Sequence, residues 1–310
     1  MPGPDPGMRR AFRPRHMTAP SLTSGFFPTP DVLRRTVPLV LITASAFLAL
    51  FGATFVTLLR DWWTNPEAGH GLLLGPLSFL LLWRYRTSER SPAMVLGLSI
   101  LLGAVGLRIL SGMAAEQYTM RLSMIVAVAG LTVCFAGGRQ LRAWWLPLAL
   151  LVLSIPLPEL ILSALALPLQ FEASELGASL LRARHVPVAL TGNVIRIPGH
   201  ELFVTEACSG LRSLTALLSL AVLMGGVSFN HVVSRWLLIG IAIPIAIVVN
   251  GVRIFVTGFA VYFISPETGT GLFHVTEGWA MFVVAFAALW VLVLIGRYAE
   301  RLWHRRRADA

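Results

Sequence analysis

The sequence predicts an all-α membrane protein: a polytopic bundle of about eight transmembrane helices with a small external cap, formed by an amphipathic helix and hairpins. Of the 310 residues, 56% are hydrophobic and only 13% are charged, whereas a soluble domain has roughly 45–50% apolar and about 25% charged residues. The mean hydropathy is +0.74, and apolar runs near the length of about 20 residues that crosses a bilayer recur along the chain. This composition excludes a soluble globular enzyme, a disordered chain and a disulfide-stapled secreted domain.

The N-terminal residues 1–35 are rich in proline and carry six arginines, which predicts a disordered cytosolic tail. The first apolar run, from Val37 to Leu59, is too long for a signal-peptide core of about 7–15 residues, and no small-residue cleavage site follows it. We therefore expect an uncleaved spanning helix at the start of a membrane domain that covers residues 36–297. Residues 298–310 form a second basic tail on the cytosolic side.

Seven further apolar runs are predicted to be spans, and the second and fifth of the eight need flanking residues to reach the required length. They are Gly71 to Trp83, Pro92 to Leu107, Leu122 to Gly137, Ala143 to Ile155, Cys208 to Val227, Trp236 to Val256 and Gly278 to Ile295.

All 25 basic residues are arginine, and the net charge is +10. They cluster in short segments between apolar runs and form nothing like a groove-reading module, so no nucleic-acid partner is expected. If the N-terminus is cytosolic, 17 of the 25 fall on the cytosolic side. By the positive-inside rule we predict a multi-pass membrane protein, surrounded by lipid, with both termini in the cytosol.

The longest external segment, Pro156 to Ala207, has two predicted parts. A first stretch carries polar residues at helical spacing, which indicates an amphipathic helix at the membrane surface. These residues are Glu172, Glu175, Ser179 and Arg182. Alternating apolar residues then surround Gly192-Asn193 and Pro198-Gly199, so we expect short strands that cap the outer mouth of the bundle.

The two cysteines are predicted at opposite faces of the membrane, so they cannot form a disulfide. Cys134 is expected to be a small buried residue within the fourth span. Cys208 opens the sixth span at the outer face, where the helix dipole favours a thiolate. From position alone, Cys208 is either a nucleophile or a second buried small residue.

Three further groups are predicted near the same outer face. Arg212 shares a helix face with Cys208, and Arg253 lies near the outer end of the seventh span. Arginine within an apolar span is costly and marks a functional site, although snorkelling to the surface is the alternative for both. His274 enters the eighth span from outside, and Glu277 three residues later can orient its ring if the stretch is helical. The alternative for His274 is an ordinary interfacial residue.

Together, thiol, guanidinium and imidazole at one membrane face are the groups needed for nucleophilic acyl transfer with oxyanion stabilisation. We expect no cofactor and no metal, because no further ligands stand at short spacing and no nucleotide-binding glycine loop is present.

The remaining histidines carry weaker signals: we assign His70, with Trp62 and Trp63, to an interfacial aromatic belt. His200 and Glu201 are expected on solvated hairpins, and His231 in the cytosol.

The chain resembles the exosortase branch of the exosortase/archaeosortase family from Trp62 to about Trp290. The supporting parts are Trp62-Trp63 with His70-Gly71, Pro168-Leu169-Gln170 and Gly192-Asn193-Val194-Ile195. The strongest motifs are Ala207-Cys208-Ser209-Gly210-Leu211-Arg212-Ser213, Asn250-Gly251-Val252-Arg253-Ile254, and His274 with Glu277-Gly278-Trp279.

The resemblance implies a membrane-embedded cysteine transpeptidase whose catalytic Cys, Arg and His fall on Cys208, Arg253 and His274. Arg212, Asn250, Glu277 and Ser209 are expected to support them. It also implies a substrate: a C-terminal sorting signal of exported proteins, made of a Pro-Glu-Pro motif, a spanning helix and a basic cluster. The acceptor nucleophile is unknown, and family members often accompany exopolysaccharide synthesis. The resemblance also implies a bacterial cytoplasmic (inner) membrane, with the active site on its external side.

Two other functions remain open at this point. A non-catalytic scaffold for polysaccharide assembly would tolerate Cys208→Ser. A transporter would need ionisable groups near the bilayer midplane and broken helices, and Pro244 is a candidate break in the seventh span.

Overall fold

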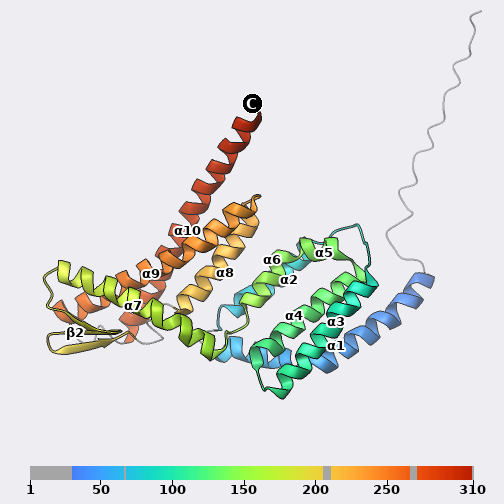
Figure 1. The fold of residues 1–310 in the computed structure, drawn as a ribbon, viewed down its shortest axis with the longest axis horizontal. Coiled ribbons are helices and arrows are strands. Elements are labelled where there is room, and N and C mark those ends of the chain that lie inside the picture. Colours follow the sequence, from blue (N-terminus) through green and yellow to red (C-terminus); the bar gives the residue numbers. More distant parts are fainter. Residues whose placement is uncertain (1–29, 66–67, 205–210, 266–270, 309–310) are drawn as a thin grey trace, which may run out of the picture. The chain divides into compact units, whose positions relative to one another are not determined.

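The structure, a computed structural model, describes residues 30–65, 68–204, 211–265 and 271–308, most of which are helical (Figure 1). The chain divides into two compact units, residues 1–52 and 53–310. The described part of the first unit is the beginning of α1. The helices are α1 (Pro30–Thr64), α2 (Gly71–Arg84), α3 (Met94–Met113), α4 (Gln117–Phe135), α5 (Gly138–Ala143), α6 (Trp145–Leu153), α7 (Glu159–Ala183), α8 (Leu211–Ser228), α9 (Val232–Phe263) and α10 (Gly271–Ala308).

Each predicted span overlaps one of these helices. Among the described residues, α1, α3, α4, α9 and α10 contain stretches long and apolar enough to cross a membrane, and α2 and α8 are shorter apolar helices. The fifth predicted span, α6, has nine residues and extends about 14 Å, less than half of a hydrocarbon core about 30 Å thick. The protein is therefore an all-α polytopic membrane protein, as predicted.

Three helices extend well beyond the predicted spans. α1 runs from Pro30 to Thr64, past both ends of the Val37 to Leu59 run. α9 continues to Phe263, seven residues beyond Val256, and it runs unbroken through Pro244. The helix break at Pro244 that the transporter hypothesis requires is therefore absent from α9. α10 begins at Gly271, before the predicted span, and continues through Arg305 to Ala308. The early start places His274 inside a helix.

Loops that we predicted on the cytosolic side lie together in the structure. The side-chain oxygen of Gln140 accepts hydrogen bonds from the backbone N–H and the hydroxyl of Thr87, both at 2.8 Å. Arg139 pairs with Glu89 across the same two loops. A third loop joins them nearby, because the guanidinium of Arg235 lies 4.9 Å from the ring centre of Trp145.

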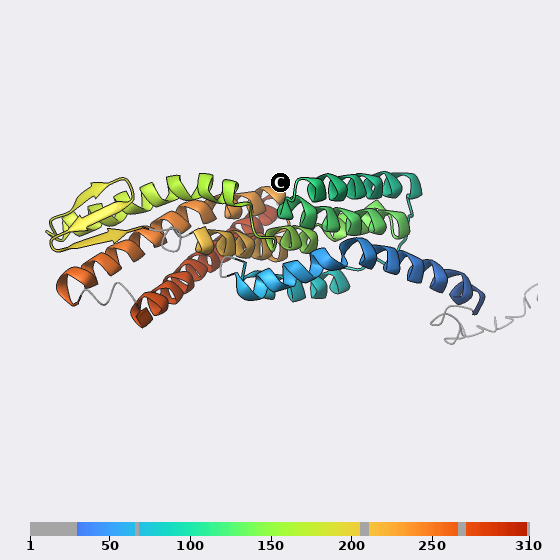
Figure 2. The ribbon, with the colours of Figure 1, turned by 90° about the horizontal axis from the view of Figure 1, so that it is seen from below.

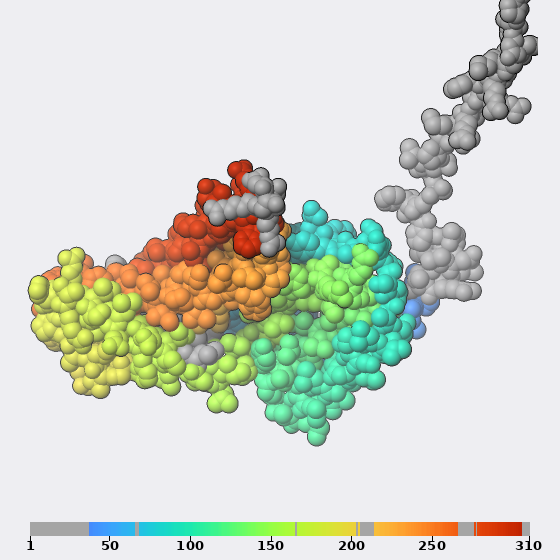
Figure 3. Space-filling model, turned by 45° about the horizontal axis from the view of Figure 1, so that its top comes forward, coloured from blue at the N-terminus to red at the C-terminus, as the bar shows by residue number. Residues whose placement is uncertain are grey.

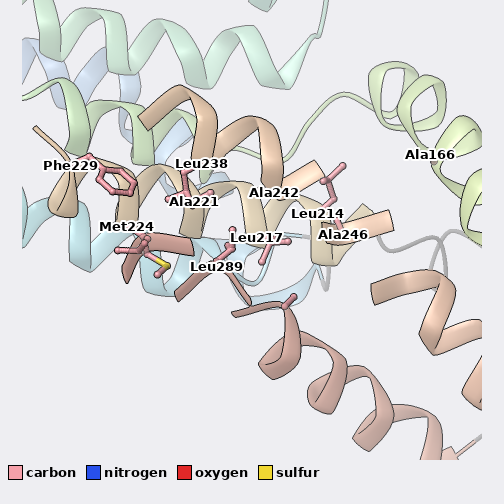
Figure 4. Close-up of a cluster of buried hydrophobic side chains, with 12 residues drawn as sticks. Ala166, Leu214, Leu217, Ala221, Met224, Phe229, Leu238, Ala242, Ala246 and Leu289 are labelled. Carbon is pink, nitrogen blue, oxygen red and sulfur yellow. The ribbon is translucent and has the colours of Figure 1, made fainter. Parts of the chain in front are cut away.

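The largest buried cluster joins α8, α9 and α10 (Figure 4). Alanines at i, i+4 spacing on α9, Ala242 and Ala246, let the helices approach closely, and Leu217 of α8 and Leu289 of α10 fill the space between them. The surfaces of α9 and α10 adjoin in the space-filling view (Figure 3). This packing brings together the three helices that carry or directly follow the predicted site residues.

α7 has the predicted amphipathic character, and its apolar face packs against α9. Its polar residues Glu172, Glu175, Ser179 and Arg182 are exposed, and so are the apolar residues Leu160, Leu167 and Phe171. On the opposite face Ala173, Ala178 and Leu181 are fully buried. The contact with α9 depends on glycines, since Gly177 lies against Ile254 and Gly251 against Leu176.

The predicted strands form a three-stranded antiparallel sheet of β1 (Ala189–Thr191), β2 (Val194–Ile197) and β3 (His200–Phe203). Gly192 has φ +62° at the first turn and Gly199 has φ +79° after Pro198 at the second. Both are positions that favour glycine. Ile195 and Ile197 are buried in a cluster with Leu181 of α7 and Ile254 and Val261 of α9. The sheet therefore lies against both helices (Figure 2).

Replacing Gly251 by alanine is expected to destabilise the contact between α7 and α9. A Cβ at this position would lie 2.5 Å from one Leu176 methyl carbon and 2.9 Å from its Cβ, and overpacking of this kind costs about 1–3 kcal/mol. We expect a lower midpoint of thermal unfolding in detergent. Gly240→Ala, on the same helix with open space around it, is the matched control. Equal midpoints for the two variants would contradict the tight packing.

Candidate active site

Arg253 and Asn250 line a small cavity between three helices. The cavity measures about 20 Å³, and its walls include Leu217 of α8 and Gly278 of α10 as well as the two polar residues of α9. A space of about 10–15 Å³ is enough for one water molecule. The cavity therefore has room for one oxygen-sized group beside the two polar side chains.

The guanidinium of Arg253 lies against the backbone of α10. A Cβ added at Gly278 would stand 3.7 Å from Nη2 and 3.8 Å from Cζ of Arg253, an ordinary contact distance, so the guanidinium lies close to α10 at this residue. His274 is four residues before Gly278 on the same continuous helix, and residues at this spacing share a helix face. The fold thus brings Arg253 to the face of α10 to which His274 belongs.

Asn250 is a second hydrogen-bond donor at the cavity. It is 6% exposed and stands three residues before Arg253 on α9, on the same side of the helix. Within the described part of the chain, its amide nitrogen has no hydrogen-bond partner. A buried unpaired donor is costly unless something binds to it, so this nitrogen is suited to receive an oxygen from a bound molecule.

The remaining predicted site residues are described only in part or not at all. Cys208 and Ser209 lie outside the described residues, and so does the predicted helical position of Cys208; the described α8 begins at Leu211. For Arg212, in the first turn of α8, and for His274 and Glu277, only the backbone is described. The backbone of α10 is helical at both His274 and Glu277, which meets the condition for their i, i+3 relation.

Arg253 lies farther from its helix end than the sequence predicted. The expected span ended three residues after it, but α9 continues for ten residues to Phe263, which is about 15 Å at 1.5 Å per residue. The extra turns pack against the sheet and α7. Snorkelling to the end of the helix would therefore need a reach longer than an arginine side chain has.

A second pocket was missed by sequence reasoning. It measures about 100 Å³ and lies beside the first turns of α8. Its lining consists of His70, Tyr118, Val152, Leu153, Ile155, Pro156, Leu157, Leu162, Thr215 and Leu218. A ring nitrogen of His70 is 3.0 Å from the carbonyl oxygen of Leu153. His70 is thus part of a structured pocket rather than only of an interfacial belt.

Trp62 also differs from the predicted aromatic belt. It is 5% exposed, and its indole N–H donates to the carbonyl oxygen of Ser154 at 2.8 Å. The indole occupies the space over Gly71 and Gly75, where any Cβ would clash with it. Only Trp63, at 80% exposed, fits the belt. The pair of glycines four residues apart was the available signal for a buried ring.

Charged groups near the start of α4 have structural partners. Arg121 is 3% exposed and pairs with Asp61 at 2.6 Å. Glu116 caps α4 by accepting hydrogen bonds from the backbone N–H groups of Tyr118 and Thr119. Burial alone would raise the pKa of Glu116, but these hydrogen bonds, that of the Thr119 hydroxyl and the charge of Arg121 hold the pKa below its ordinary value. The Glu116 carboxylate therefore stays ionised and caps the start of α4.

Comparison with protein-family models matches residues 62–291 to the family described as transmembrane exosortase (Exosortase_EpsH). The chain belongs to the exosortase family. The match begins at Trp62, includes the positions of Cys208, Arg253 and His274, and leaves out both basic tails. No curated protein and no solved structure matched this exosortase. With its several apolar helices it is a multi-pass membrane protein of that family.

Proposed function

We propose that this exosortase is a membrane-embedded cysteine endopeptidase and transpeptidase that removes C-terminal sorting signals from exported proteins. One observation carries the proposal: Arg253 and Asn250 line a cavity between α8, α9 and α10. Arg253 also contacts the α10 face that carries His274. These helices are the ones that the family's Cys, Arg and His motifs occupy or directly precede.

The position of Cys208 in the sequence supports the same arrangement. It stands three residues before the start of α8, and three residues span at most about 11 Å. Leu217, in the second turn of α8, already lines the cavity with Arg253. Cys208 therefore stands in the segment that leads into a helix lining the cavity, and we propose that its thiol reaches a carbonyl bound there.

The proposed reaction begins when His274 takes the proton of the Cys208 thiol. The thiolate attacks the scissile carbonyl carbon, and the carbonyl oxygen becomes an oxyanion that accepts hydrogen bonds from Arg253 and Asn250. The C–N bond then breaks, and His274 gives its proton to the leaving amine, which departs with the C-terminal helix. An acceptor amine or water attacks the thioester and restores the thiol. Glu277 orients His274, while Arg212 and Ser209 support the nucleophile.

The proposed substrate is the kind of sorting signal that the family resemblance implies. We propose a signal with a Pro-Glu-Pro motif, an apolar helix and a basic cluster, and a link to exopolysaccharide production. Orientation follows from the arginine distribution: both termini are cytosolic, and the site faces the outside of a bacterial inner membrane. Three arginine-bearing loops that meet at one end of the bundle support this orientation, since all three were assigned to the cytosolic side.

The test uses the full chain in sealed inside-out and right-side-out membrane vesicles with a tagged substrate carrying such a signal. We expect cleavage between the motif and the helix, with the N-terminal product on the face opposite the protein's own termini. Mass spectrometry of the product identifies hydrolysis or transfer. Absence of cleavage in both vesicle orientations, with a correctly folded protein, would overturn the proposed activity.

A further inference from the structure

We propose that the 100 Å³ pocket lined by His70 is a specificity subsite that binds a small apolar side chain of the substrate near the cleaved bond. The inference rests on the proposed function and goes beyond it, because it names the part of the substrate that this exosortase selects. We call this 100 Å³ pocket the His70 pocket.

The first argument is the position of the His70 pocket relative to α8. Leu217 lines the Arg253 cavity, whereas Thr215 and Leu218 line the His70 pocket. Successive residues of an α-helix are about 100° apart, so α8 stands between the two spaces. The chain immediately before α8 contains Cys208. The two spaces therefore flank the helix that directly follows the proposed nucleophile.

The width of α8 sets the position of the selected residue. A helix with its side chains is about 10–12 Å across, and an extended peptide advances about 3.3–3.6 Å per residue. A substrate strand that crosses the beginning of α8 therefore needs about three residues to pass from one space to the other. The His70 pocket is expected to receive the side chain about three residues from the scissile carbonyl.

The lining determines which side chain fits. Apolar residues dominate it, among them Ile155, Leu157 and Leu162, and none of the described lining residues is an aspartate, glutamate or arginine. A charged side chain would lose its hydration there without a fixed counter-charge. The volume of about 100 Å³ is smaller than the cavity of about 150 Å³ that binds benzene. Residues of the size of valine, proline or leucine fit, and tryptophan does not.

Two hydrogen bonds hold the pocket in a preformed state. His70 contacts the carbonyl of Leu153, and Trp62 donates to the carbonyl of Ser154. The two acceptors are the last residue of α6 and the residue that follows it, and the end of α6 together with the segment before α7 forms one wall of the pocket. Binding sites that are formed in advance lose less entropy when they bind, so this wall is suited to discriminate by shape.

The test compares cleavage of substrates substituted singly at each of the three positions on either side of the cleaved bond. Leu157→Ala enlarges the pocket, and Leu157→Val is a milder change for use if the alanine variant fails to fold. Leu160→Ala, at a position that is 84% exposed, is the matched control. We expect the parent to cleave substrates with valine or leucine at one position at least about tenfold faster than those with phenylalanine or tryptophan.

Enlarging the pocket should restore cleavage of the phenylalanine substrate at that position alone, whereas Leu160→Ala should behave as the parent does. If the parent cleaves all substrates equally, or if both Leu157 variants keep the parent's size preference at every position, the subsite proposal is wrong while the activity stands. If the folded parent cleaves none of them, the proposed function itself fails.

Discussion

Cleavage of the sorting signal is expected to stop when Cys208 is replaced by alanine. Loss of a protease nucleophile lowers kcat by on the order of a million-fold, which takes the rate below detection. Cys134→Ala is the matched control, because Cys134 is 4% exposed and packs against Gly97. The measurement is the amount of product in vesicles that contain equal quantities of each folded variant.

The same pair of cysteines gives an independent readout. A membrane-impermeant thiol reagent should modify Cys208 of the parent faster than the buried Cys134, and the modification should end cleavage. Full activity of Cys208→Ala would remove the cysteine mechanism and leave the non-catalytic scaffold as the better account of the chain.

Replacement of Arg253 by alanine is expected to lower kcat by about 100- to 1,000-fold, the usual cost of one lost oxyanion donor. The effect should fall on kcat rather than on KM, because the oxyanion exists only in the transition state and the intermediate. Arg253→Lys keeps the charge but loses the planar fork of donors, so we expect strong impairment there as well. Rates are measured with the tagged substrate at saturating concentration.

Gly240→Ala is the matched control for Arg253. Gly240 lies on the same helix, has open space around it and does not line the cavity, so we expect a rate within a few-fold of the parent. Arg212→Ala tests the assignment of roles. If both Arg253 variants keep the parent rate while Arg212→Ala is inactive, the two arginines have been assigned the wrong way round.

Much of the fold was predictable because a membrane restricts the options. Backbone groups in lipid must find partners within their own segment, so each long apolar run becomes a helix. The Gly192-Asn193 and Pro198-Gly199 turns were equally local, since they depend on φ values that few residues adopt. Helix lengths were less predictable, because α9 continues past its bilayer-sized run where the sheet and α7 pack against it, and the extension of α10 carries Glu300, which accepts hydrogen bonds from Asn230, His231 and Ser234.

The sequence by itself determined the helices, the turns of the sheet, the polar face of α7 and the family's motif residues, including Arg253. All of these depend on neighbours in the chain. Only the tertiary structure decided that Arg253 and Asn250 share a cavity beside Gly278, that Trp62 is buried over two glycines, and that His70 lines a pocket next to α8. In lipid, protein-facing and lipid-facing side chains are both apolar, so hydropathy carries little information about which helix faces meet.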